Sequence, residues 1–217
     1  MYGQDGHFLA IFLLELNDGV ERVIVRVEQS LAAYRPKRSL LRPLARRSAV
    51  ALILQQREGQ LHVLMIQRAD REGDPWSGQM AFPGGHLEAV DRHGRDAAVR
   101  ETEEEIGLTL DQASPCIGRL SDIMARPRLV KPMIVSPYVF RIDKAPRLVL
   151  NYEVADTVWI PIPYFQNSAN REEMQWTHGK VSMTLPCYLY RDYRVWGLSL
   201  MMLDELLKVM PAVESLR

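Results

Sequence analysis

The stretch that decides the fold runs from Gly84-Gly85-His86-Leu87-Glu88-Ala89-Val90-Asp91 to Arg100-Glu101-Thr102-Glu103-Glu104-Glu105-Ile106-Gly107-Leu108. It begins with two glycines after a proline and ends with four glutamates in five positions, just before another glycine. Drawn as a helix, its second part places Glu101, Glu104 and Glu105 within an arc of about 100°, whereas Glu103 points elsewhere. The sequence therefore predicts a helix with three carboxylates on one face.

These three carboxylates are candidate metal ligands. Like charges at i,i+4 destabilise a helix by about 0.2–0.5 kcal/mol per pair, so their convergence favours a bound cation. Mg²⁺ or Mn²⁺ suits oxygen ligands, and the backbone carbonyl of Gly85 is a further candidate ligand. The alternative is a solvated acidic helix end, which would place negative charge at the unfavourable end of the helix dipole.

Composition favours one ordinary globular domain. The 217 residues are 47% apolar and 25% charged, and 27 Lys and Arg balance 27 Asp and Glu. Because the net charge is zero and produces no overall electrostatic field, we expect neither nucleic acid nor a membrane as a partner. Two cysteines are too few for a disulfide framework, so a cytoplasmic protein with reduced thiols is expected. The apolar run Phe8–Leu14 is too short to span a bilayer and indicates an extra packed element or a homodimer contact.

The segments before the glycines predict a short N-terminal extension and then a hairpin. Residues 20–34 are consistent with a helix ending before Pro36, although their valines fit a strand as well. No acidic residue occurs from Gln29 to Arg57, where a solvated basic linker is favoured over a contact for substrate phosphates. Two β-prone runs, residues 48–54 and 61–66, flank a turn at Gly59, and a polar loop over residues 68–78 follows.

The second half of the chain alternates predicted strands with two helices. The carboxylate helix is expected from about residue 94 or 95 to Ile106, with Gly107 ending it. Strands are predicted over residues 116–121, 133–142 and 157–160, and a strand or hairpin over residues 180–190. Residues 163–180 are treated as a loop that sets specificity. Residues 195–210 form an amphipathic helix with Met201 and Met202 toward the core. The sum is a layered α/β or α+β domain with a mixed sheet.

Gly85 to Leu108 resembles the Nudix box, whose pattern is G-x5-E-x7-R-E-U-x-E-E-x-G-U with U an aliphatic residue. The half that begins at Arg100 matches closely, with Thr102 at the aliphatic position. The first half departs in two ways. Fourteen residues separate Gly85 from Arg100, one more than in the pattern, and Arg92 occupies the position of the pattern's first glutamate.

That departure resembles one subgroup, the coenzyme A pyrophosphatases, which carry F-P-G-G-x-x-D-x-x-D and one added residue. The matching run is Phe82 to Asp91, with Glu88 replacing the first aspartate. Three further segments are similar to the subgroup: Val135-Ser136-Pro137, Glu153 with Trp159-Ile160-Pro161, and Val195-Trp196-Gly197-Leu198-Ser199. Where the subgroup has a histidine before its Gly-Gln, this chain has Trp76.

The resemblance implies the Nudix fold, a mixed sheet sandwiched between helices, over residues 48–217, with 1–47 as an extension and helix packed on it. It implies metal-dependent hydrolysis of a nucleoside diphosphate linked to another group, first of all coenzyme A or its acyl esters to 3′,5′-ADP and the 4′-phosphopantetheine. Another nucleotide (ADP-ribose, a dinucleotide or an oxidised nucleotide) and a non-catalytic nucleotide-binding regulator remain open as alternatives.

Particular residues follow from these expectations. Glu101, Glu104 and Glu105 would be catalytic metal ligands, and Arg100 would form a bidentate pair with a carboxylate of the box, a surface salt bridge being the alternative. Glu153 is a candidate general base or ligand from a distant loop, or a structural loop end. The expected substrate contacts are Arg68, Trp76, Phe82 and Gly84, where the two aromatic rings either stack on a base or pack.

Overall fold

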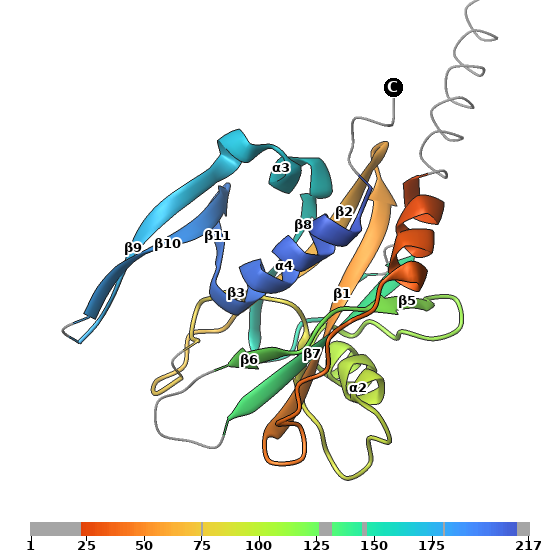
Figure 1. The fold of residues 1–217 in the computed structure, drawn as a ribbon, viewed down its shortest axis with the longest axis horizontal. Helices are drawn as coiled ribbons and strands as arrows, with labels where there is room; N and C mark the ends of the chain where they lie inside the picture. The colour runs from red at the N-terminus through yellow and green to blue at the C-terminus, as the bar shows by residue number, and fades with distance from the viewer. Residues whose placement is uncertain (1–22, 75, 126–131, 145–146, 180, 212–217) are drawn as a thin grey trace, which may run out of the picture.

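A mixed β-sheet forms the centre of the protein (Figure 1). The computed structural model describes residues 23–74, 76–125, 132–144, 147–179 and 181–211, so the run Phe8–Leu14 and any dimer contact it makes lie outside the described residues. The sheet has the order β3-β2-β1-β7-β5, and β4, β6 and β8 pair with β1, β7 and β2. Its strands are β1 Arg46–Arg57, β2 Gln60–Arg68, β3 Met80–Ala81, β4 Gly84–His86, β5 Cys116–Arg119, β6 Ile123–Ala125, β7 Met133–Ile142 and β8 Val154–Pro161.

The predicted hairpin is β1 and β2, which pair antiparallel with Ile53 opposite Leu64. Glu58 and Gly59 both have positive φ, 49° and 77°, so the turn uses the left-handed region that glycine adopts readily. By contrast, β1 and β7 run parallel. Both faces of β1 are buried in the middle of its length, and its side chains there are apolar almost without alternation, as is typical of a strand covered on both faces.

Helices cover both faces of this sheet, and each face has its own core. On one face, α2 (Gly94–Ile106) packs Ala97, Ala98 and Ile106 against β1, β2 and β7. On the other, a helix over residues 23–33, α3 (Ile162–Gln166) and α4 (Gly197–Val209) enclose the larger cluster. The expected layered fold is confirmed, and residues 23–33 are helical rather than extended.

A second sheet extends from the main body as an arm (Figure 1). It contains β9 (Arg171–His178), β10 (Val181–Tyr190) and β11 (Tyr193–Trp196). Three expectations for this region are wrong. Residues 163–180 hold most of α3, the 3-10 helix Ser168–Asn170 and β9 rather than one loop, Val195 and Trp196 belong to a strand, and Met201 is exposed on α4.

The basic segment between the first helix and β1 is fixed to the domain. Its Arg42 Nη1 lies 3.0 Å from Oδ2 of the buried Asp122, and the backbone N–H of Ser39 donates to the same oxygen at 2.9 Å. Arg119 and Ser136 also bond to this carboxylate. The expectation of a solvated linker is therefore wrong for Arg42, because a buried acid far along the chain holds it.

Candidate active site

Helix α2 places Glu101 and Glu105 against the glycines of β4. The helix begins after His93, whose backbone N–H donates to Asp96 Oδ2 at 2.9 Å. It ends at Gly107, whose φ of 66° is left-handed and whose N–H bonds to the Glu103 carbonyl. The predicted start and stop of this helix are confirmed.

The paired glycines allow the strand β4 to approach the helix closely. The N–H of Gly84 donates to Glu105 Oε2 at 2.9 Å. A Cβ at Gly84, where φ is 151°, would overlap with the backbone of Ala49, and a Cβ at Gly85 would overlap with the Glu101 carboxylate. A side chain is therefore excluded at Gly84 by the backbone, whereas a side chain at Gly85 would displace the Glu101 carboxylate that lies against it.

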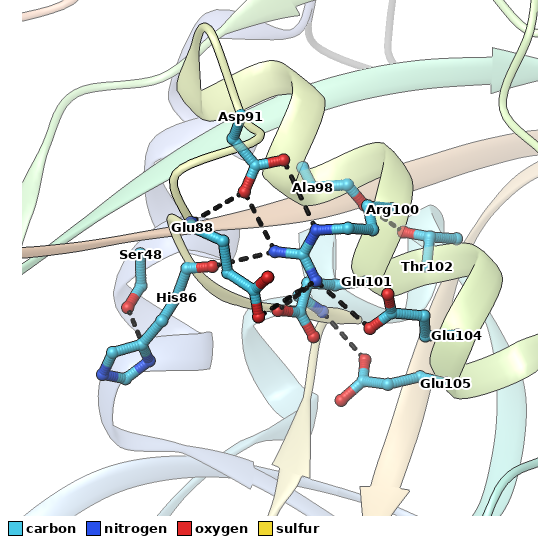
Figure 2. A network of polar contacts seen from close by, with 11 residues as sticks. Ser48, His86, Glu88, Asp91, Ala98, Arg100, Glu101, Thr102, Glu104 and Glu105 are labelled. Carbon is cyan, nitrogen blue, oxygen red and sulfur yellow. Dashed lines mark hydrogen bonds and ion pairs between the residues drawn. The ribbon is translucent and has the colours of Figure 1, made fainter.

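Arg100 links the loop after β4 to the carboxylate face (Figure 2). Its Nε and Nη2 form a fork on Asp91, at 3.4 Å and 3.0 Å. Its Nη1 donates to Glu101 Oε1 at 3.0 Å and Glu104 Oε2 at 3.1 Å, and its Nη2 also donates to the His86 carbonyl. The bidentate partner is thus Asp91, while Glu101 and Glu104 each receive a single bond.

Burial and crowding disfavour the negative charges in this site. Only 3% of Glu105 is exposed, and burial raises the pKa of its carboxyl to about 7, with nearby Glu101 and Glu153 adding to the shift and the Gly84 N–H opposing it. Burial likewise raises the pKa of Glu101. The hydrogen bonds from Arg100 lower the pKa of Asp91. The site therefore needs a positive charge or a proton at Glu105.

The carboxylate and carbonyl oxygens of this site are of the type that binds a hard divalent cation, although the carboxylates are not gathered around one position. Within the described residues, no group of three or more His, Cys, Asp or Glu side chains is arranged to hold a metal ion. Arg100 supplies the neutralising charge to Glu101 and Glu104, whereas the Glu105 carboxylate accepts a hydrogen bond from the uncharged Gly84 N–H. Carboxylate oxygens and the Gly85 carbonyl match the ligands that Mg²⁺ and Mn²⁺ prefer.

Glu153 approaches the site from a loop attached to the end of α2. The N–H of Asn151 donates to the Glu105 carbonyl at 2.9 Å, and the Asn151 side chain accepts from the Glu153 N–H at 2.8 Å. The Glu153 carboxylate lies near enough to raise the pKa of both Glu101 and Glu105. Arg71 Nη2 holds Glu153 Oε1 at 3.3 Å and its guanidinium lies over the Tyr152 ring.

The expected substrate contacts divide into three situations. Arg68 Nη2 bonds Asp74 Oδ2 at 2.7 Å, and its positive charge lies near enough to oppose the rise in the pKa of Glu105. Trp76 is 37% exposed and available to a ligand. Phe82 is buried in the larger core cluster, so its ring packs, and we leave it out of the proposed substrate contacts.

Sequence reasoning did not find two features of this site. These are the fork of Arg100 on Asp91 and the pairing of Arg71 with Glu153. The fork on Asp91 depends on how the loop before α2 folds back, and Arg71 and Glu153 are brought together by the hydrogen bond from Ala69 N–H to the Glu153 carbonyl. Spacing along the chain carries no signal for either contact.

A sheet enclosed by helices, with a glycine loop facing a glutamate-rich helix, defines the class of Nudix hydrolases. The family model for the NUDIX domain matches residues 45–183, and the chain belongs to this family. It is therefore a hydrolase that acts on diphosphate bonds, a reaction for which Nudix enzymes use divalent metals.

Curated relatives support the resemblance to the coenzyme A pyrophosphatase subgroup. The mitochondrial coenzyme A diphosphatase of Mus musculus is 27% identical over 90% of this chain and 91% of the relative. An uncharacterized protein of Schizosaccharomyces pombe is 32% identical over 62% of this chain, which spans only 46% of that relative's length. A MutT/nudix family protein from Enterococcus faecalis has the same fold, with a TM-score of 0.51 and 18% identity over 100% of this chain and 80% of that structure.

Proposed function

We propose that the protein is a Mg²⁺- or Mn²⁺-dependent pyrophosphohydrolase that cleaves coenzyme A or acyl-coenzyme A to 3′,5′-ADP and the corresponding 4′-phosphopantetheine. One observation carries the proposal of a working site: the carboxylate of Glu105 is 3% exposed, carries a raised pKa and faces the Gly84 backbone beside Glu101. A regulator without catalysis would have no use for this costly buried charge. The relative named as a coenzyme A diphosphatase, matched over nearly its full length, supports the substrate.

In this proposal, each residue has a defined task. Glu101, Glu104, Glu105 and the Gly85 carbonyl would hold the cation, which neutralises diphosphate oxygens and makes a nearby water more acidic. Arg100 fixes the glycine loop to the helix through Asp91 and the His86 carbonyl. Glu153 Oε accepts a proton from the attacking water as the water oxygen bonds to phosphorus and the bond from phosphorus to the bridging oxygen breaks.

A second substrate class has one observation in its favour. Trp76 stands where the subgroup carries a histidine, and its exposed ring offers a surface on which a nucleotide base can stack. This favours ADP-ribose, a dinucleotide or an oxidised nucleotide as the alternative, with the same metal ligands.

The substrate is tested with a panel of coenzyme A, an acyl-coenzyme A, ADP-ribose, dinucleotides and nucleoside triphosphates, each incubated with Mg²⁺ or Mn²⁺. We expect 3′,5′-ADP and phosphopantetheine, identified by mass, to form fastest and only with metal. If coenzyme A were the poorest substrate on the panel, the proposed specificity would be wrong while the hydrolase class would stand. A matched Trp76→His variant, which restores the subgroup residue, should keep or improve coenzyme A turnover.

Arg71 and Glu153 are expected to act as a unit. Glu153→Gln should lower kcat by about 10²-fold or more, since it removes the proton acceptor. Arg71→Met should lower kcat less, and it should add nothing in the Glu153→Gln background, because Arg71 acts through Glu153. Arg191, an exposed arginine that also lies over a tyrosine ring, provides the control Arg191→Met. Additive losses in the double variant would contradict the coupling.

The remaining proposals concern the whole chain. Within the described ranges, no helix is long and apolar enough to cross a membrane. We keep as proposals a cytoplasmic location, a small-molecule nucleotide as the partner, a homodimer, and the division of the chain at residue 48.

A further inference from the structure

The turn before β1 exposes leucines to an unusual extent. Over residues 39–44 the backbone turns back on itself, with hydrogen bonds from Arg42 N–H to the Ser39 carbonyl and from Leu44 N–H to the Leu41 carbonyl. On this turn Leu40 is 95% exposed, Leu44 73% and Leu41 41%. Isolated exposed leucines are common, whereas three on one short projecting turn form a patch that calls for a partner. We call residues 38–47 the leucine turn.

Positive charge surrounds these leucines. Arg38, Arg46 and Arg47 are exposed at the two ends of the leucine turn, and Lys37 precedes it. No acidic residue occurs from Gln29 to Arg57. The carboxylate that holds the turn, Asp122, has a buried side chain that is already bonded to Arg42, Arg119 and Ser136. The exposed surface of the leucine turn is therefore apolar at its tip and cationic at its base.

The leucine turn is held in this shape. Asp122 accepts from the Ser39 N–H at 2.9 Å and from Arg42, while the Asp122 N–H donates to the Lys37 carbonyl at 2.9 Å. The buried carboxylate thus fixes the backbone of the turn, while the three leucines stay exposed. In Figure 1 the turn projects beyond the start of β1 at the edge of the molecule.

We propose that the leucine turn is a membrane-surface contact that binds anionic lipid bilayers. A projecting tip of leucines fits insertion between lipid headgroups, where it needs no complementary groove. The flanking arginines then lie at the depth of the lipid phosphates, and each contributes about a fivefold gain in partitioning onto an anionic surface. This departs from the expectation drawn from the chain's net charge, because a net charge of zero averages over the surface and conceals a local cationic patch.

The experiment measures co-sedimentation of the full chain with vesicles of phosphatidylcholine alone or with about one third phosphatidylserine. We expect binding to the anionic vesicles only, and a sharp fall between about 0.1 M and about 0.5 M NaCl, since salt screens the arginines. Leu40→Ser with Leu44→Ser should weaken binding at least about tenfold. Arg38→Gln with Arg47→Gln should weaken it by a similar factor and reduce its salt dependence.

Controls separate this contact from other surfaces. Met183→Ser with Met201→Ser removes exposed apolar side chains from the arm and α4, and it should bind vesicles like the unsubstituted protein. All variants should keep the same thermal unfolding midpoint, because the substituted side chains are exposed. Equal binding to both kinds of vesicle, or unchanged binding after the leucine substitutions, would overturn the proposal. So would a leucine variant that changes from dimer to monomer while no form binds vesicles, since the turn would then contact a second copy.

Discussion

Replacing Glu105 with glutamine is expected to lower kcat/KM by about 10²–10⁴-fold without unfolding the protein. Glutamine has the same shape, and its carbonyl oxygen can still accept the Gly84 N–H that now bonds Glu105 Oε2. What it removes is the negative charge that burial makes costly and that a divalent cation would neutralise. Turnover of coenzyme A with and without Mg²⁺, followed by mass, measures the loss.

Thermal unfolding is a second measurement on the Glu105→Gln variant, and its result does not depend on which substrate the protein cleaves. Without metal, the Glu105→Gln variant should be at least as stable as the unsubstituted protein, because a buried charge is gone. Added Mg²⁺ or Mn²⁺ should raise the unfolding midpoint of the unsubstituted protein and have little effect on the variant. Glu103→Gln is the matched control, since Glu103 lies on the same helix but bonds Thr109 away from the site. Equal metal stabilisation of both variants would show that Glu105 is not a ligand.

Elements with a strong local pattern were predictable from the sequence. The carboxylate helix begins at Gly94 and ends at Ile106 because Gly107 adopts a left-handed conformation that stops it. The strand Met133–Ile142 coincides with its predicted range, since it lies buried at the middle of the sheet and is apolar along most of its length. The strand Arg171–His178 was missed because it is an edge strand of charged and polar residues, with only Met174 and Trp176 alternating on one face.

For the candidate site, the helix face was predictable and the contacts between distant segments were not. Helical geometry alone placed Glu101, Glu104 and Glu105 together and Glu103 apart. The pairing of Arg100 with Asp91 depends on a loop that folds back on the helix, and the burial of Phe82 depends on which face of the sheet its strand presents. Arg42 shows the same limit, because its acidic partner is 80 residues away along the chain. The spacing of residues along the sequence shows which face of a helix a side chain occupies, whereas the tertiary packing determines which residue it contacts.

The second large effect is expected in stability. Asp122→Ala should lower the free energy of unfolding by about 3–5 kcal/mol, because it leaves the guanidinium groups of Arg42 and Arg119 without their buried counter-charge. The backbone N–H of Ser39 also loses its acceptor, and the segment that leads into β1 loses its anchor. Urea denaturation measures the change.

Asp143→Ala is the matched control for this prediction. Asp143 also pairs with an arginine, Arg141, at 3.4 Å, but its side chain is 72% exposed, so water replaces the lost contact. That substitution should cost less than about 1 kcal/mol. The comparison isolates burial, since both substitutions remove an aspartate that pairs with arginine. Similar losses for the two variants would mean that the Asp122 network adds no more than a surface ion pair, and that β1 and the glycine loop beside it keep their positions without this anchor.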